Sequence, residues 1–437
     1  MQRPIATRDQ WICSNGTMVR SRTARGFAKG ASSLAAMFLL AFLTSVSPAG
    51  AAGIVNQGAV PTPPTSKATG KGVDFEYLAT PASVRPFTAE ELRNAIPAEP
   101  PTPADSLDVP SFTRGASTSA ATGDFTPASA TGFPERIHGK IFFRVGEKIF
   151  SCSGTVVDSK NRNVVYTAGH CVYDVEAGRY VDQLAFIPGY TNGATPYEVF
   201  YATGVGTTQA WIDRADQSYD LGIVTVEGQV QSKLGSRQLA FDLNPIDREV
   251  TIYGYPSRPN PPFDGEILRG CHAEIKGHDQ TRSDPRPLGA TPCFMQQGSS
   301  GGGWVALGNY VMSVVSYGYC DSNPASCGVM FGPVFSQAAK NLYVKTGGSP
   351  RPTFRVKNGP PKVVRKRKVS FRFTGTAATL VTFKCKLDRQ PIVNCSNRIS
   401  ITRLRPGKHT LRAWIVDQTG KASKKVVRNF RVKLRRR

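Results

Sequence analysis

The chain has 437 residues, of which 40% are hydrophobic, so it has room for about two to four domains and is too apolar to be disordered throughout. It contains 55 Lys and Arg against 31 Asp and Glu, and the formal net charge of +24 would suit nucleic acid or another polyanion. Residues 351–437 hold 26 of the basic residues and two acidic ones, Asp388 and Asp417, so they carry the whole excess. The charge therefore belongs to one module, and residues 1–350 are neutral overall.

The N-terminus has the order of a secretory signal. Several basic residues precede the apolar stretch 34–43, and small residues follow at 49–51. The apolar stretch has ten residues, whereas a membrane-spanning helix needs roughly 20. We therefore predict a signal peptide over 1–51, no transmembrane segment after its cleavage, and a secreted, extracellular protein. Cleavage would remove Cys13 and leave eight cysteines, an even number that suits four disulfides outside the cell.

Residues 52–130 are rich in Pro, Thr, Ala and Ser. Such a composition buries little apolar surface, so the segment is expected to be mostly disordered. One short helix is predicted at Phe87–Arg93, with Thr88 as its cap and Glu91 completing a capping box. The composition suits either a low-complexity pro-segment or a plain linker.

Residues 131–346 have the pattern of an all-β domain. Short β-branched and aromatic runs are separated by Gly, Pro, Asn and Asp, which favours a barrel or a sandwich. One helical stretch, 334–343, closes the domain, and residues 347–352 have the composition of a linker. The strands are expected at 140–145, 163–166, 221–226, 250–253 and 310–315.

Residues 353–437 form a second, smaller β unit. Leu411, Ala413 and Ile415 alternate with Arg412 and Trp414. Because side chains alternate between the two faces of a strand, the apolar set is expected in a core and the basic set outside.

Three segments of the larger domain carry groups suited to nucleophilic catalysis. His170 follows an apolar strand, Asp220 opens another, and Ser300 lies in a glycine-rich segment. A hydroxyl needs a base to remove its proton, and the base needs a partner that fixes its tautomer. Asp213 and Asp216 are rivals of Asp220, but only Asp220 stands directly before an apolar run.

These segments resemble a known family. Thr167–Cys171 with Cys152–Thr155 upstream, then Asp220–Val224 and Gly298–Gly302, resemble the trypsin-like (chymotrypsin-fold) serine proteases. Two further segments, 133–137 and 253–256, are similar to the bacterial glutamyl endopeptidase branch. The resemblance covers about residues 130–345 and implies a two-barrel protease domain with a C-terminal helix.

The resemblance also implies the roles of the site residues. Ser300 would be the nucleophile, His170 the general base and acid, and Asp220 the carboxylate that orients the histidine. The amides of Gly298 and Ser300 would form the oxyanion hole. Ser299 is adjacent, but the family places the nucleophile directly before a pair of glycines, which selects Ser300.

Substrate contacts follow from the same resemblance. The pocket for the substrate side chain would involve Phe294, Val315, Ser316 and Gly318, and it would be apolar or small. The backbone of Ser316 would pair with the substrate main chain. Ser299 stands where animal enzymes have an Asp that pairs with a freed N-terminal amine during activation, so activation in that form is not expected here. Arg136–Ile137 nevertheless resembles a processing site.

The cysteines are assigned structural roles. By resemblance, Cys152 and Cys171 would form the disulfide beside His170, while local pairing is the simplest assignment for the others and their connectivity stays open. No metal and no cofactor are expected, and His138, His272 and His278 are taken as surface or loop residues. The remaining pairs would be Cys271 with Cys293, Cys320 with Cys327, and Cys385 with Cys395.

The C-terminal unit resembles a bacterial immunoglobulin-like domain in the segments around Cys385 and Cys395 and in 405–413 and 416–420. A small immunoglobulin-like β-sandwich is therefore expected, with Trp414 packed. Its 26 basic residues exceed what solubility requires, so we expect 351–437 to dock on a polyanion at the cell surface. The candidates are anionic cell-wall polymers, lipid head groups or extracellular DNA. The sequence has no motif of sequence-specific nucleic-acid recognition, so any binding to DNA is expected to be non-specific.

The pattern thus predicts a secreted serine endopeptidase acting on polypeptide substrates through an acyl-enzyme on Ser300. A non-catalytic binding or adhesion protein on a protease-like scaffold is the alternative. An esterase of the same fold is a third interpretation.

Overall fold

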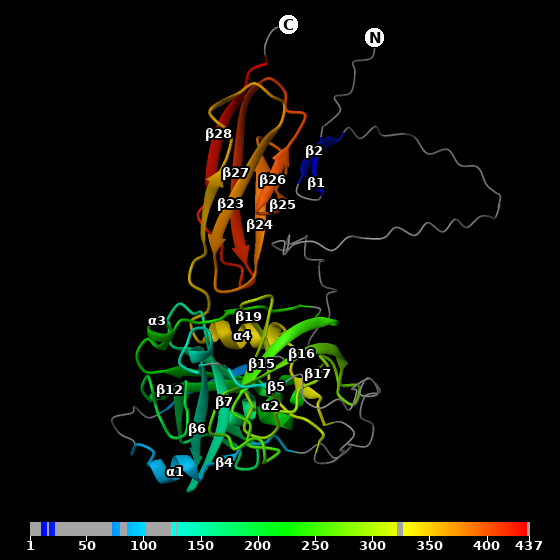
Figure 1. The fold of residues 1–437 in the computed structure, drawn as a ribbon. Helices are drawn as coiled ribbons and strands as arrows, with labels where there is room; N and C mark the ends of the chain where they lie inside the picture. The colour runs from blue at the N-terminus through cyan, green and yellow to red at the C-terminus, as the bar shows by residue number, and fades with distance from the viewer. Residues whose placement is uncertain are drawn as a thin grey trace, which may run out of the picture.

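The computed structural model describes residues 10–14, 17–21, 72–78, 85–101, 124–127, 129–243, 245–320 and 327–434. A larger domain and a smaller C-terminal module are joined end to end (Figure 1). The predicted cleavage site near Ala51 lies outside the described residues, and of the predicted signal peptide the structure describes only two short strands, β1 (Gln10–Ser14) and β2 (Thr17–Ser21).

The first half of the larger domain is a closed six-stranded barrel, because β11 pairs with both β6 and β12. Every residue of β8 and β13 is buried, so these strands are continuous apolar runs without the alternation of a one-sided sheet. The barrel strands are β6 (His138–Val145), β7 (Lys148–Val157), β8 (Val164–Thr167), β11 (Gln183–Pro188), β12 (Phe200–Thr208) and β13 (Gly222–Val226). Two short helices, α2 (Gln209–Arg214) and α3 (Val230–Leu234), follow β12 and β13.

The second half is a partly open barrel in the strand order β14-β19-β18-β15-β16-β17-β20. Its core contains Trp304, Met295 and the disulfide between Cys271 and Cys293. Its strands are β14 (Gln238–Leu239), β15 (Arg248–Gly254), β16 (Arg269–His278), β17 (Leu288–Thr291), β18 (Gly303–Ala306), β19 (Tyr310–Val314) and β20 (Met330–Gly332).

A helix, α4 (Gln337–Lys345), closes the domain against the first barrel. It begins three residues later than predicted because Ser336 is extended and its hydroxyl accepts a hydrogen bond from the amide of Ala338. The hydroxyl of Tyr166 donates to the carbonyl oxygen of Ala339 at 2.6 Å and fixes the helix on β8. The predicted all-β, two-barrel fold with a C-terminal helix is confirmed.

Parts of the segment before residue 131 lie on this domain. Strand β3 (Val73–Tyr77) pairs with β12, β4 (Ile96–Pro97) with β7, and β5 (Asp124–Phe125) with β16. Helix α1 (Ala89–Arg93) has the predicted capping box, which is confirmed. The described parts of 52–130 are therefore ordered pieces of the domain surface, contrary to the disorder that composition suggested for them.

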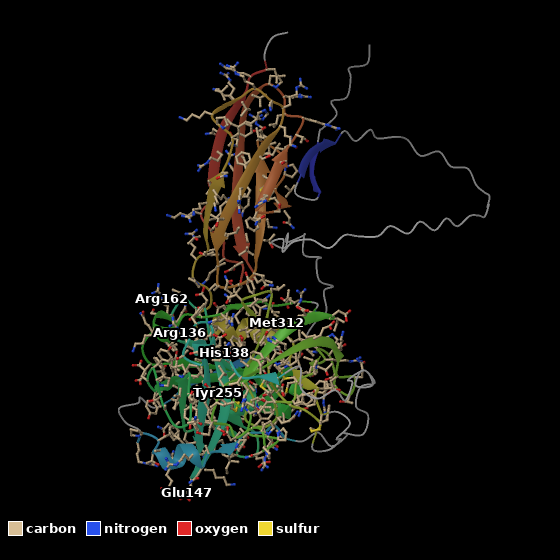
Figure 2. The ribbon with its side chains drawn as sticks, in the orientation of Figure 1. Arg136, His138, Glu147, Arg162, Tyr255 and Met312 are labelled. Carbon is tan, nitrogen blue, oxygen red and sulfur yellow. A yellow bond between two sulfur atoms is a disulfide. The ribbon has the colours of Figure 1, made fainter. Side chains whose placement is uncertain are left out.

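One expectation about the start of the first barrel was wrong. His138 is only 2% exposed; its ring stacks on Tyr253 with 4.1 Å between centroids, and it lies inside the domain (Figure 2). Burial holds the pKa of His138 well below its ordinary value. Ile137 is fully buried, so the Arg136–Ile137 bond is not an accessible processing site in this conformation.

The C-terminal module consists of two sheets, with strand orders β1-β2-β26-β23-β21 and β22-β28-β27-β24-β25. The predicted alternation is confirmed, since Leu411 and Ala413 are buried while Arg412 is exposed. A disulfide joins Cys385 to Cys395. The strands are β21 (Thr353–Asn358), β22 (Val363–Val364), β23 (Val369–Thr376), β24 (Val381–Leu387), β25 (Val393–Cys395), β26 (Arg398–Ile401), β27 (Gly407–Asp417) and β28 (Val426–Val432).

The module is attached to the larger domain by more than its linker. The side-chain amide of Gln418 accepts from the backbone amide of Phe241 at 2.9 Å and donates to the Phe241 carbonyl oxygen at 2.5 Å. The amide of Leu239 donates to the carbonyl oxygen of Ala378 at 2.8 Å. Within the ranges described, no helix is both long and apolar enough to cross a membrane.

Candidate active site

His170 is held at the end of β8 in a single 3₁₀ turn, Gly169–Cys171. The disulfide between Cys152 and Cys171 ties this turn to β7. Gly169 permits the close approach of the turn to its neighbours, because a Cβ there would lie 2.9 Å from the Oδ1 atom of Asp220 and 2.9 Å from Oγ1 of Thr207. The sequence thus places the imidazole directly against a buried carboxylate.

Asp220 lies between a 3₁₀ turn and β13, and it is fully buried. Its Oδ1 accepts from the backbone amide of His170 at 2.9 Å, and its Oδ2 lies 2.8 Å from Nδ1 of that residue. A carboxylate only accepts, so Nδ1 carries the proton and the neutral imidazole keeps Nε2 as an acceptor. The hydroxyl of Ser316 donates to Oδ2 at 2.5 Å and further stabilises the carboxylate.

The rival carboxylates have other partners. Oδ1 of Asp213 accepts from the side chain of Gln209, four residues earlier, on the surface of α2. Asp216 caps the 3₁₀ turn through the amide of Ser218. Among these three aspartates, only Asp220 contacts His170 through the described hydrogen bonds.

The two adjacent serines differ in their partners. The hydroxyl of Ser299 donates back to the carbonyl oxygen of Gln296 at 2.9 Å. The hydroxyl of Ser300 donates to the carbonyl oxygen of Ala98, which belongs to the segment before the barrels, at 3.3 Å. Within the described part of the chain, Nε2 of His170 is buried and has no hydrogen-bond partner. Ser300 lies close to the turn that carries His170, since Sγ of Cys171 contacts the carbonyl oxygen of Ser300 at 3.8 Å, while the described hydrogen bond of the Ser300 hydroxyl goes to Ala98.

Gly298 forms the turn before the serines with φ of +91°, and a Cβ there would lie 2.6 Å from the carbonyl oxygen of Tyr255. Its carbonyl oxygen accepts from the hydroxyl of Ser153 at 2.9 Å. The backbone amide of Ser153 also donates to the carbonyl oxygen of Ser300 at 2.7 Å. Ser153 thus holds both peptide units that flank the expected oxyanion hole, a role that sequence reasoning missed because Ser153 lies 145 positions before Gly298.

A cavity of about 290 Å³ opens beside Ser300. Val315, Ser316 and Gly318 line it as expected, whereas Phe294 is not among its lining residues. The amide of Phe294 donates instead to Asp124, whose pKa is raised by burial. The other lining residues are Glu99, Pro100, Pro101, Gln217, Gln296, Gln297, Ser299, Tyr317 and Met330.

The cavity is lined by neutral side chains wherever the wall comes from the larger domain. Nε2 of Gln296 is buried and has no hydrogen-bond partner among the described residues. A buried donor without a partner is costly, so a ligand that supplies an acceptor gains free energy there. The walls thus favour an uncharged side chain with a hydrogen-bond acceptor.

Three disulfides lie in the larger domain. Besides the bond beside His170, they join Cys271 to Cys293 and Cys320 to Cys327. The described residues contain two groups that offer three metal-ligand atoms, Cys152 with His170 and Cys171, and Asp124 with Cys271 and Cys293. Each group includes both sulfurs of a disulfide, which are not thiolate ligands, so neither fits a metal ion.

Comparison with known proteins gives one family. The sequence model described as Trypsin matches residues 131–337. An extracellular metalloprotease of Bacillus subtilis is 26% identical over 133 residues, which are 30% of this chain and 41% of that protein. A glutamyl endopeptidase of Bacillus licheniformis is 26% identical over 129 residues, which are 29% of this chain and 38% of that protein. The chain thus spans about two fifths of the length of these relatives.

Solved structures give matches that cover about half of the chain. The protease Anisep from Arthrobacter nicotinovorans is 29% identical, with a TM-score of 0.44, and the match covers 48% of this chain and 95% of that one. The thermostable serine protease AL20 from an extremophilic microorganism is 33% identical, with a TM-score of 0.44, and the match covers 48% of this chain and 97% of that one.

Proposed function

Since residues 131–337 of this chain belong to the trypsin family of serine proteases, we propose that it is a secreted serine endopeptidase with Ser300 as nucleophile, His170 as base and Asp220 as the orienting carboxylate. The observation that carries the proposal is the buried pair of His170 and Asp220, whose 2.8 Å contact leaves Nε2 free to accept a proton. The relatives match only part of this chain, so the proposed activity rests on the geometry of this site.

The chemistry follows from the positions of these groups. Nε2 of His170 takes the hydroxyl proton as Oγ of Ser300 attacks the peptide carbonyl carbon, and Asp220 stabilises the resulting imidazolium. The amides of Gly298 and Ser300 would stabilise the oxyanion. His170 then returns the proton to the leaving amine, which departs and leaves an acyl-enzyme on Ser300. A water molecule, deprotonated by His170, hydrolyses the ester and restores the serine.

Replacement of the nucleophile tests the proposal. Ser300→Ala should lower kcat by about 10⁶ and abolish covalent labelling by a fluorophosphonate. Ser370→Ala is the control, because Ser370 is exposed on the C-terminal module and its hydroxyl contacts that of Ser400, and this variant should keep its activity. Full turnover by Ser300→Ala would overturn the assignment. Binding to a partner without labelling of an enzyme freed of the segment before residue 131 would favour the non-catalytic adhesion protein, and ester hydrolysis without peptide hydrolysis would favour the esterase.

Secretion is part of the same proposal. The structure holds four disulfides, which persist in oxidising compartments. The signal-like N-terminus and the extracellular designation of the Bacillus subtilis relative point in the same direction.

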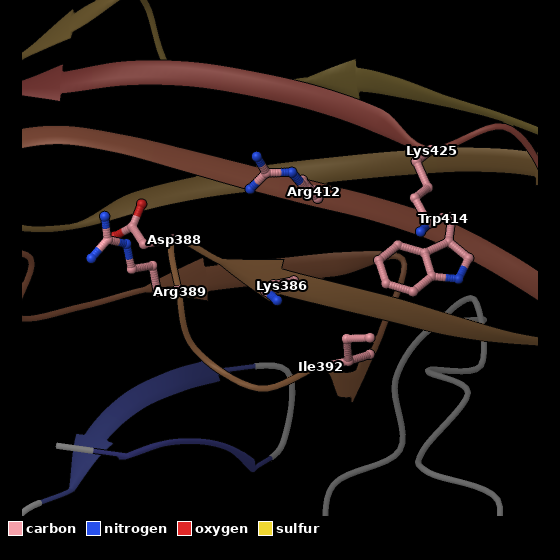
Figure 3. Close-up of a pocket in the computed structure, with 7 residues that line it drawn as sticks. All are labelled: Lys386, Asp388, Arg389, Ile392, Arg412, Trp414 and Lys425. Carbon is pink, nitrogen blue, oxygen red and sulfur yellow. The ribbon is translucent and has the colours of Figure 1, made fainter. Parts of the chain in front are cut away.

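For the C-terminal module we propose docking on an anionic polymer at the cell surface. A hollow of about 420 Å³ lies over β24 and β27 (Figure 3). Trp414 is 8% exposed and the ammonium group of Lys425 lies 5.0 Å from its ring centroid, so the indole serves as packing beneath a basic surface. The residues around the hollow are Lys386, Asp388, Arg389, Ile392, Arg412, Trp414 and Lys425.

Binding to phosphocellulose as a function of salt tests the docking. Binding should weaken as salt rises, and reversal of charge at Lys386, Arg412 and Lys425 should weaken it at every salt concentration. The same reversal at three exposed lysines of the larger domain should have a smaller effect; these are Lys148, Lys160 and Lys345. Equal losses in the two triple variants would contradict a dedicated surface on the module.

A further inference from the structure

A stretch of the chain that precedes the protease domain runs through the active-site cleft. After α1, β4 pairs in parallel with Phe150 and Ser151 of β7. The amide of Ala98 then donates to the carbonyl oxygen of Ser151 at 2.9 Å, and Ala98 is only 5% exposed. Its methyl group packs in the hydrophobic core that also contains the disulfide cysteines beside His170.

The contact with the nucleophile is unproductive. In an attack, the carbonyl carbon must face Oγ of Ser300 while the oxygen faces the amide donors. Here the oxygen of Ala98 faces Oγ and accepts a hydrogen bond from it at 3.3 Å. The hydroxyl is thus engaged by Ala98, and among the described residues Nε2 of His170 is left without a partner.

The same stretch fills the entrance to the substrate cavity. Glu99, Pro100 and Pro101 form part of the cavity wall beside Ser300. The side-chain amide of Gln217 donates to the carbonyl oxygen of Pro101 at 3.1 Å. A polypeptide substrate that placed a side chain in this cavity would therefore contact residues of the segment before the protease domain.

Helix α1 fixes the stretch to the first barrel. The carboxylate of Glu91 accepts from Arg144 of β6 at 3.1 Å and from Arg85. The guanidinium of Arg144 also lies 5.2 Å from the ring centroid of Phe87, which in turn stacks on Tyr201 of β12 at 6.5 Å. Because these contacts involve two strands of the barrel, the segment is docked by specific side chains and not only by its passage through the cleft.

We propose that residues 85–101 are an autoinhibitory pro-segment, which holds the hydroxyl of Ser300 away from His170 and must leave the cleft before turnover. The inference rests on the proposed function, since it assigns a regulator to the same site. Of a plain linker and a pro-segment, the proposal thus adopts the second.

The experiment uses the full chain with a recognition site for a foreign protease placed between residues 102 and 123, outside the described ranges. Fluorophosphonate labelling of Ser300 and hydrolysis of a peptide library are followed before and after the cut. The freed leader is removed by gel filtration in mild denaturant, and the enzyme is refolded. A synthetic peptide of residues 85–101 is then added to the cut enzyme.

Labelling of the uncut chain should be slow, because only the fraction with an open cleft reacts. Removal of the leader should raise the labelling rate by about tenfold or more. Ala98→Asp should raise labelling of the uncut chain, since it puts a charge at a buried contact. Ile96→Asp is the matched control, because this side chain is 49% exposed two positions away. The synthetic peptide should inhibit and remain uncleaved, and its Ala98→Asp form should not inhibit.

The outcomes are distinguishable. Equal labelling of cut, uncut and Ala98→Asp chains, with no inhibition by the peptide, would overturn autoinhibition and leave the protease assignment intact. If the freed enzyme is not labelled in the absence of the peptide, although it still binds the peptide when this is added, the protease assignment is overturned and the regulation with it. If Ala98→Asp fails to fold, the inhibition by the synthetic peptide decides.

Discussion

The hydroxyl of Ser153 donates to the carbonyl oxygen of Gly298 at 2.9 Å and thereby connects the first barrel to the loop of the nucleophile. The hydroxyl oxygen of Ser153 in turn accepts from the backbone amide of Tyr255 at 2.9 Å. Ser153 is 1% exposed and has no route to substrate. It is therefore a positioning residue for the oxyanion hole.

Ser153→Ala should lower kcat by about tenfold with little change in KM, because the Gly298 peptide loses the donor that holds it. Steady-state kinetics give the two constants separately, and Ser153→Thr, which keeps the hydroxyl, should restore part of the rate. Ser159→Ala is the control, since the buried hydroxyl of Ser159 has no partner among the described residues. A rise in KM alone would contradict the positioning role.

Asp220→Asn should lower kcat by about 10⁴, because an amide can no longer select the Nδ1–H tautomer of His170. Asp213→Asn serves as the control, since Asp213 accepts only from Gln209 on the surface of α2. Fluorophosphonate labelling rates report the same difference without a substrate. If both variants lost activity equally, the assignment of Asp220 would be wrong.

The neutral cavity predicts the substrate residue before the scissile bond, called P1. Peptides with Gln at P1 should be cut at least about tenfold faster than those with Arg or Glu, because a charge would be desolvated without a counter-charge. Gln296→Met removes the unpaired donor and should lower the preference for Gln over Leu. Fluorogenic peptides measure the ratios of kcat/KM. A strong preference for Glu in the wild type would show that the cavity wall recognises charge.

Acid should release the pro-segment. The hydrogen bond from Arg85, together with the Thr88 amide and Arg144, lowers the pKa of Glu91 from 4.5 to about 2. Arg85 and Thr88 belong to the docked segment itself, so only the contribution of Arg144 of β6 depends on docking. Because that contribution lowers the pKa, it favours the docked state above pH 4.5 and is lost as the pH falls toward about 2. In a chain cut between 102 and 123, retention of the leader fragment should therefore weaken in that window.

Gel filtration at each pH, with near-ultraviolet circular dichroism to monitor the fold, measures this release. Glu91→Gln should weaken retention already at neutral pH, whereas Glu90→Gln should not, because Glu90 is exposed on the same helix. Retention that stays constant down to pH 2 with the domain folded would contradict the prediction.

The sequence predicted the parts of the molecule that depend on local patterns. The capping box of Thr88 and Glu91 spans three residues, and the buried strand after Asp220 is a continuous apolar run, so both are visible without a structure. The grouping of His170 with Ser300 came from the family resemblance and stays a proposal, which is supported by the contact of Cys171 with the carbonyl oxygen of Ser300.

The rest depends on contacts between distant segments. Ala98 and Ser300 are 202 positions apart, and the sequence around Ala98 is a Pro-rich stretch with no catalytic pattern. The sequence predicted His138 on the surface or in a loop, yet the pairing of β6 in the barrel buries it. The resemblance assigned Phe294 to the pocket from its position six residues before Ser300. A sequence position does not show that the amide of Phe294 donates to Asp124.

The paired hydrogen bonds between Gln418 and Phe241 have a consequence for a molecule held on a surface. They fix the basic module at one end of the protease domain, while α1 and β4, which mark the cleft, lie at the other end (Figure 1). A polyanion bound over β24 and β27 would thus lie at the end of the molecule away from α1 and β4, so the proposed docking leaves the path of the pro-segment free.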